Sequence, residues 1–262
     1  MVLVRKWPTW LVTMGLKSIF VLAMLGVLGL LISILWFLPA SLAWQQLSSS
    51  LVYPKDLAVA TPRGSVREGS TWLRFRGFPP SQLSWQAGWP RVTEGEPTID
   101  YDLRLQGPDH LLTGNLTLTL SNQNLKVNAI QGYLGSNDIN RLAVPFGHQF
   151  SGEFTLREGA FKIQNSCLTS LTGTLLWTGG PIVFSTPRET ARYDLPQLSA
   201  DLSDQDCGIR VDVKTVNSDS ARLVLSTEGW FLAELAPEFL QALGVKGAAQ
   251  LKGPLLFEEK IL

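Results

Sequence analysis

The chain has 262 residues, 45% of them hydrophobic, so it is long enough to bury one sizeable core. Its 22 basic side chains balance 22 acidic ones, but three of the basic residues precede a long apolar run and leave the rest of the chain slightly acidic. Such a domain lacks the basic face that neutralises phosphates, which excludes a nucleic-acid-binding protein of the usual electrostatic kind.

The first predicted element is a single transmembrane helix over residues 18–38, a run of 21 residues without a charge. A helix of this length rises about 1.5 Å per residue and crosses a hydrocarbon core about 30 Å thick. The basic residues Arg5, Lys6 and Lys17 lie before the run, whereas none of the 16 residues after it is charged. This asymmetry predicts a cytoplasmic segment over residues 1–17 and a translocated remainder.

Two other interpretations of the apolar run stay open. Ser41-Leu42-Ala43 offers the small residues that signal peptidase prefers, so the run could belong to a removed signal peptide, although such peptides have an apolar region of only about 7–15 residues. The run could also be a buried core helix, although it has no polar face. Residues 39–56, which are rich in serine, are expected to form a short interfacial stalk.

Residues 57–262 are predicted to form a mainly β domain on the far side of the membrane. Leucine alternates with threonine from Leu116 to Leu120, and Tyr101, Leu103 and Leu105 alternate with charged residues, the period of two of a strand with one wet face. Turn-forming pairs separate such runs at short intervals. The pattern predicts an antiparallel β-sandwich or a curved, partly closed sheet.

Two segments of this domain carry more specific predictions. Residues 152–164 place apolar side chains symmetrically about Glu158-Gly159, which predicts a β-hairpin. One later helix is expected from Leu235 to Leu243, because Pro237 suits a first turn and Gly244 suits a stop.

The two cysteines, Cys167 and Cys207, both lie in the translocated part, where an oxidising compartment permits a disulfide. We expect them to be paired, and the alternative is two buried thiols. With only two histidines, His110 and His148, the chain lacks the paired ligand spacing of a zinc site.

Motifs that carry chemistry are missing from the sequence. It contains no G-x-S-x-G nucleophile elbow and no glycine-rich phosphate loop of the two common types. Asp100 and Asp102 share a strand face, but alternation leaves them solvated, so we expect no general acid–base pair there. We therefore predict neither catalysis nor a cofactor, and an unrecognised hydrolase is the minor alternative.

Tryptophan is over-represented, with nine in the chain and five in the predicted β domain over residues 57–262. Packing in the core or at the sheet edge is the ordinary interpretation of such residues. Tryptophan and arginine also make effective partner contacts. The residues expected to act in this way are Trp72, Arg74, Arg76, Trp85 and Trp89.

With these strands placed, the chain resembles the type II secretion system protein N family. The likeness rests on a G-x-x-x-x-G element at residues 64–69, on Leu83-Ser84-Trp85 with the turn at Pro90, on a G-x-L-x-W-x-G-G element at residues 173–180, and on Gly229. The resemblance implies an uncleaved N-terminal span in the cell inner membrane and a β-rich periplasmic domain. It also implies a non-enzymatic role in protein export, with other inner-membrane or periplasmic subunits of the secretion system as partners.

A second function is compatible with the residues themselves. Rows of leucine and valine on a curved sheet can line a groove that shields lipid chains. The alternative to a structural component is therefore a membrane-anchored β-groove protein that binds or carries lipid.

Overall fold

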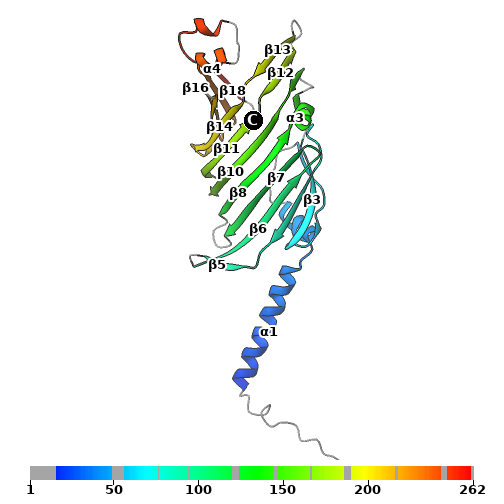
Figure 1. Cartoon of the computed structure of the whole chain (residues 1–262). Coiled ribbons are helices and arrows are strands. Elements are labelled where there is room, and N and C mark those ends of the chain that lie inside the picture. The colour runs from blue at the N-terminus through cyan, green and yellow to red at the C-terminus, as the bar shows by residue number, and fades with distance from the viewer. Residues whose placement is uncertain are drawn as a thin grey trace, which may run out of the picture.

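The computed structural model describes residues 16–48, 56–75, 77–93, 95–119, 124–143, 147–165, 167–185, 190–215, 218–242 and 247–260. It consists of one long antiparallel sheet, a small second sheet and a few helices (Figure 1). The mainly β, antiparallel prediction is confirmed. Of the two predicted architectures the single curved sheet is present, and it is open rather than closed.

The helices are short apart from the first. Their bounds are α1 Leu16–Trp36, α2 Ala40–Ser48, α3 Ser136–Ala143 and α4 Pro237–Ala242, with a 3₁₀ turn at Ala248–Gln250. The helix α1 has 21 residues, and its apolar side chains project into the surroundings, with Phe20 72% and Met24 68% exposed. Among the residues that the structure describes, no helix combines the length and the hydropathy that a membrane crossing requires.

Two of the expected segments take a definite form. The predicted later helix is present as α4, in which Phe239 and Leu240 are buried. The segment expected as a stalk contains α2, whereas residues 49–55, like residues 1–15 of the predicted cytoplasmic segment, lie outside the described part of the chain.

The long sheet is an antiparallel meander, in which strands that follow one another along the chain lie side by side. Its order is β1-β3-β4-β6-β7-β8-β10-β11-β14-β15-β16-β17-β18, with β2 paired to β3 and β5 paired to β6. The strands are β1 Leu57–Val59, β2 Arg63–Gly64, β3 Glu68–Phe75, β4 Ser81–Ala87, β5 Arg91–Thr93, β6 Glu96–Gln106, β7 His110–Thr119, β8 Leu125–Gly135, β10 Glu153–Gln164, β11 Cys167–Trp177, β14 Leu198–Gln205, β15 Gly208–Thr215, β16 Ser218–Leu225, β17 Trp230–Leu235 and β18 Leu255–Lys260. Figure 1 shows this succession running from β3, beside α1, to β16 and α4 at the opposite end.

A small three-stranded sheet, β13-β12-β9, lies beside the long one. Its strands are β9 His148–Phe150, β12 Gly180–Ser185 and β13 Thr190–Leu195. Because only one face of the long sheet is covered, and only in places, the core is shallow. Among the large described side chains only Asp138 is less than 2% exposed.

The predicted hairpin at residues 152–164 is wrong, because β10 runs through it as one strand. The register against β11 and β8 shifts at Glu158 and Gly159, where Glu158 adopts a φ of 52°. An inserted residue of this kind is a β-bulge, which exchanges the faces to which successive side chains point. The apolar residues on the two sides of the bulge therefore share one face, which explains the mirrored pattern without a chain reversal.

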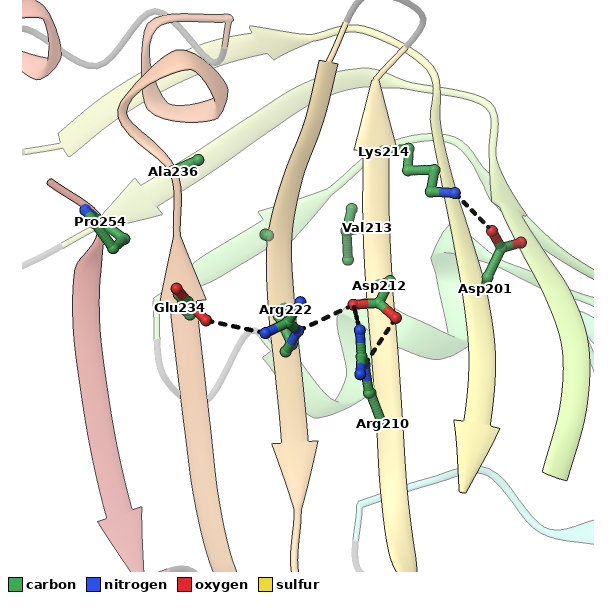
Figure 2. Close-up of a pocket in the computed structure, with 10 residues that line it drawn as sticks. Asp201, Arg210, Asp212, Val213, Lys214, Arg222, Glu234, Ala236 and Pro254 are labelled. Atoms are coloured by element: carbon green, nitrogen blue, oxygen red, sulfur yellow. Dashed lines mark hydrogen bonds and ion pairs between the residues drawn. The ribbon is translucent and has the colours of Figure 1, made fainter. Parts of the chain in front are cut away.

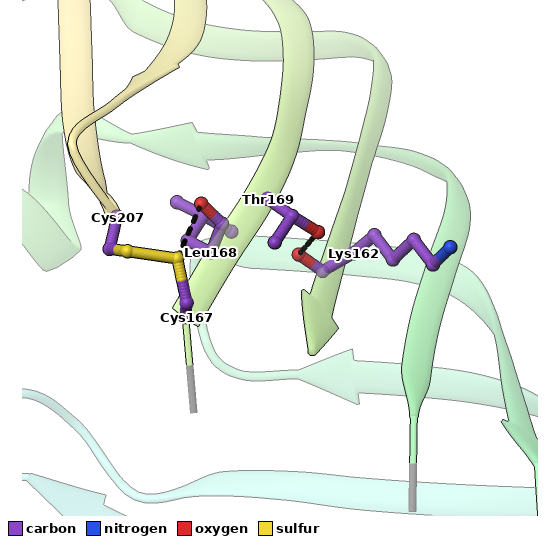
Figure 3. Close-up of a disulfide and its surroundings, with 5 residues drawn as sticks. All are labelled: Lys162, Cys167, Leu168, Thr169 and Cys207. Atoms are coloured by element: carbon purple, nitrogen blue, oxygen red, sulfur yellow. Dashed lines mark hydrogen bonds between the residues drawn. A yellow bond between two sulfur atoms is a disulfide. The ribbon is translucent and has the colours of Figure 1, made fainter. Parts of the chain in front are cut away.

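The expected disulfide is present between Cys167 and Cys207 (Figure 3). It joins the first residue of β11 to the turn between β14 and β15. In that turn Asp206 and Cys207 have φ angles of 49° and 63°, the left-handed conformation that a tight hairpin turn requires at both central residues. The disulfide therefore holds a strained hairpin tip against the neighbouring strand.

Candidate functional site

The two faces of the long sheet differ sharply in chemistry. One face carries a cross-strand row of polar residues on β11, β14, β15, β16 and β17, namely Thr174, Asp201, Asp212, Arg222 and Glu234. The residues next to them in sequence are apolar and point to the opposite face. The polar row and its neighbours line an open cavity of about 390 Å³.

Ion pairs connect this row (Figure 2). Figure 2 shows Arg222 between Asp212 and Glu234, with N–O distances of 3.2 Å and 3.5 Å, and Arg210 on the other side of Asp212 at 2.8 Å. Lys214 completes the group by pairing with Asp201 at 3.1 Å. Three basic and three acidic side chains cancel, so the cavity has no net charge to attract an ionic ligand.

The carboxylate at the centre of this network has a shifted pKa. Burial alone would raise the pKa of Asp212, but hydrogen bonds and positive charge from Arg210 and Arg222 outweigh burial and lower it from its ordinary value of 3.8. A lowered pKa keeps Asp212 ionised, which suits an ion pair and not a general acid.

The opposite face carries an uninterrupted row without a charged side chain. The row takes one residue from each of the twelve strands that follow β1 in the order given above, and each residue is the register partner of the next. Its members are Thr71, Leu83, Leu105, Leu112, Gly132, Leu156, Leu175, Ala200, Val213, Ala221, Leu235 and Leu255. We call it the apolar row. Since neighbouring strands lie about 4.8 Å apart, it extends about 50 Å across the sheet.

Three apolar cavities lie along the apolar row, and together they form what we call the groove. The first, of about 440 Å³, contains Thr71 and Leu83, and the second, of about 590 Å³, contains Leu112 and Leu156. The third, of about 270 Å³, shares Leu175 with the second. The first and second cavities share no lining residue, and in all three cavities most of the lining residues are apolar.

Separate segments cover each part of the groove. Trp44 of α2 lines the first cavity, Ile139 of α3 lines the second, and Ile182 of β12 lines the third. Phe150 of β9 lies between the second and third cavities and lines both. In the first cavity, burial raises the pKa of Tyr101 above its ordinary value of 10.0, which keeps the phenol neutral.

A buried polar pair fastens α3 beside the groove. The Nδ1 atom of His110 lies 2.6 Å from Oδ2 of Asp138, which also accepts a hydrogen bond from the backbone N–H of Asp109 at 2.9 Å. His110 and Asp138 are 2% and 0% exposed, and the ring of Phe78 packs on His110 at 4.9 Å. These bonds hold α3 against the β6–β7 turn.

The residues predicted to contact partners do not form one surface. Trp72, which is 51% exposed, and Arg74 point away from the groove, whereas Trp85 points into it and lines the first cavity. Trp89 is 70% exposed on the loop before β5 and stacks on Trp36. Arg76 lies outside the described residues.

The acidic pair on β6 has ordinary partners. Asp100 bonds to Arg91 and accepts a hydrogen bond from Thr117 at 2.7 Å, and Asp102 accepts one from Asn115. Within the described part of the chain no three metal-ligating side chains come together. These carboxylates belong to the polar face.

The family comparison decides what kind of protein carries this groove. The model of the type II secretion system protein N family matches residues 55–252. The chain belongs to this family. No curated protein and no solved structure matches it significantly. Membership in the protein N family implies involvement in type II secretion.

The glycine and tryptophan elements of this protein N chain build the groove. A Cβ on Gly69 would lie 2.5 Å from the ring of its register partner Trp85, whose indole N–H donates to the Ser65 carbonyl at 3.2 Å. Trp177 repeats the arrangement, because a Cβ on Gly152 would lie 2.8 Å from its ring nitrogen, which donates to a carbonyl at 3.0 Å. Each tryptophan ring packs against a glycine and lines an apolar cavity.

Proposed function

We propose that the protein is a non-enzymatic inner-membrane component of the type II secretion system, held by α1 and exposing its β domain to the periplasm. The anchor is supported by the 21 uncharged residues from Ser18 to Leu38 and by the exposed apolar side chains of α1. The disulfide supports a periplasmic location of the β domain, because disulfides persist in compartments where thiols are oxidised.

Contacts with other secretion subunits are best supported at the far edge of the sheet. Among the described strands, the edge strand β18 has β17 as its single partner, and all its described residues are exposed, with Leu256 at 64% and Phe257 at 51%. An unpaired edge offers a row of backbone donors and acceptors to which a partner strand can add.

Site-specific crosslinking in intact cells tests this function. We expect a photoreactive residue at Leu256 to yield an adduct with another secretion subunit and one at Thr174, on the polar face, to yield none. The proposal fails if neither position, nor Trp72, yields an adduct with any component of the secretion system. Alkaline extraction and protease accessibility after opening the outer membrane test the anchor and the orientation.

A second candidate function is the binding of lipid acyl chains in the groove. The observation that favours it is the apolar row, which crosses twelve strands without a charged side chain. Extended grooves with apolar walls and few polar groups suit long apolar ligands.

Adjacent residues on opposite faces provide a matched test of the groove. We expect native mass spectrometry to detect bound phospholipid in the full-length protein and in Thr174→Arg, and to detect none in Leu175→Arg. Ala200→Phe, which fills the third cavity without adding a charge, covers the case in which Leu175→Arg does not fold. Equal lipid content in the folded groove variants and the wild type would exclude acyl-chain binding at this site.

A further inference from the structure

The end of the sheet nearest α1 exposes a group of apolar side chains. Phe37, directly after α1, is 65% exposed, Trp89 is 70% exposed, and Val92 on β5 is 73% exposed. We call these three residues the basal patch. Figure 1 shows β5 at the end of the sheet that adjoins α1.

The basal patch is joined rigidly to α1. The rings of Trp36, the last residue of α1, and Trp89 stack at 5.5 Å with an interplanar angle of 12°. The backbone N–H of Val66 donates to the Leu38 carbonyl at 2.9 Å, and Pro39 forms a β-bridge with Ser65. The helix and the sheet therefore hold a fixed relative position.

Two donors beside the patch lack an acceptor. The guanidinium carbon of Arg67 lies 5.9 Å from the Trp36 ring and 5.6 Å from the Trp89 ring, and within the described part of the chain Arg67 makes no ion pair. Trp36 is 9% exposed, and its indole N–H has no hydrogen-bond partner there. The Trp36 nitrogen has almost no exposed surface, so of the two groups only Arg67, which is partly exposed, can meet an outside acceptor.

We propose that the basal patch lies in the headgroup layer of the bilayer that holds α1, with Arg67 facing phosphate oxygens of phospholipids. Tryptophan rings favour this layer because they are apolar with one polar edge, and guanidinium groups bind phosphate well. This inference rests on the proposed membrane anchor, because the basal patch begins at Phe37, directly after α1. It places the first cavity of the groove, lined by Trp44 of α2, next to the membrane surface.

An environment-sensitive dye on a single cysteine tests the position of the patch. The chain has no free cysteine, so Val92→Cys and the control Leu256→Cys, an exposed apolar residue at the other end of the sheet, give unique labels. The full-length protein is reconstituted into phosphatidylglycerol and phosphatidylethanolamine vesicles that contain lipids with a headgroup quencher. We expect quenching at position 92 to exceed quenching at position 256 by about twofold or more.

The outcomes separate the patch from the anchor. Equal quenching at both positions in protein that stays in the vesicles under alkaline extraction overturns the inference and leaves the anchor intact. Release from the vesicles overturns the anchor as well. As a second variant, Arg67→Gln is expected to lower the quenching at position 92, and unchanged quenching would exclude a phosphate contact of Arg67.

Discussion

Breaking the disulfide should destabilise the domain by an amount that the fold allows us to calculate. Cys167 and Cys207 are 40 residues apart, and closing a loop of about 40 residues removes chain entropy worth about 4 kcal/mol from the unfolded state. The double variant Cys167→Ser with Cys207→Ser should lose this stabilisation while it retains the left-handed turn.

The backbone conformation of Cys207 makes a second contribution to the free energy of unfolding, opposite in sign to that of the disulfide. Its φ of 63° costs a residue with a side chain about 1 kcal/mol, a cost that glycine does not have. The pair Cys167→Ser with Cys207→Gly should therefore lose only about 3 kcal/mol, because glycine releases strain that serine keeps.

Urea unfolding of the full-length protein in mild detergent, followed by tryptophan fluorescence, measures both terms. The wild type with and without reductant serves as the control for the crosslink itself. Equal unfolding midpoints of oxidised and reduced wild type would refute the entropic contribution. Equal midpoints of the serine and glycine variants would refute the assignment of strain to the turn.

Three further predictions concern single side chains. Asp138→Ala should lower the free energy of unfolding by about 2–4 kcal/mol, because it leaves His110 buried without its partner, and Asp138→Asn should lose less in the same urea assay. The stability that Asp212 contributes, present above its ordinary pKa of 3.8, should be lost as the pH falls through its lowered folded-state pKa. Urea midpoints of the wild type and Asp212→Asn should therefore converge in acid, and a constant difference would contradict the ion-pair account. Glu158→Gly should stabilise the bulge by about 0.5–1 kcal/mol in denaturant unfolding, whereas Glu158→Val should destabilise it.

The alternation of side chains predicted the strands well, because it records which face of a sheet is wet. The same pattern misled at residues 152–164, where a bulge and a hairpin both produce apolar positions on the two sides of a glycine. Only the partner strands β8 and β11 distinguish the two, and pairing between distant segments cannot be derived from a local pattern.

The groove was foreseen only as an alternative, and its parts were not located. Single residues such as Leu156 and Leu175 are unremarkable in sequence, and only the register aligns them across the strands into one row. The covering helix α3 was missed because its eight residues are mostly polar, and β12 was missed because a short apolar run is ambiguous until a sheet face lies beneath it. Trp85 and Trp177 were recognised as family elements, but their packing on glycine required the structure.

The meander also bears on how the protein reaches its folded form. Neighbouring strands of the long sheet follow one another along the chain, apart from the insertions that carry β9, β12 and β13. A sheet with this connectivity can grow from its N-terminal strand as the polypeptide is delivered, without waiting for the C-terminus. Its last strand, β18, is then the final one to be added, and until it arrives β17 is the growing edge.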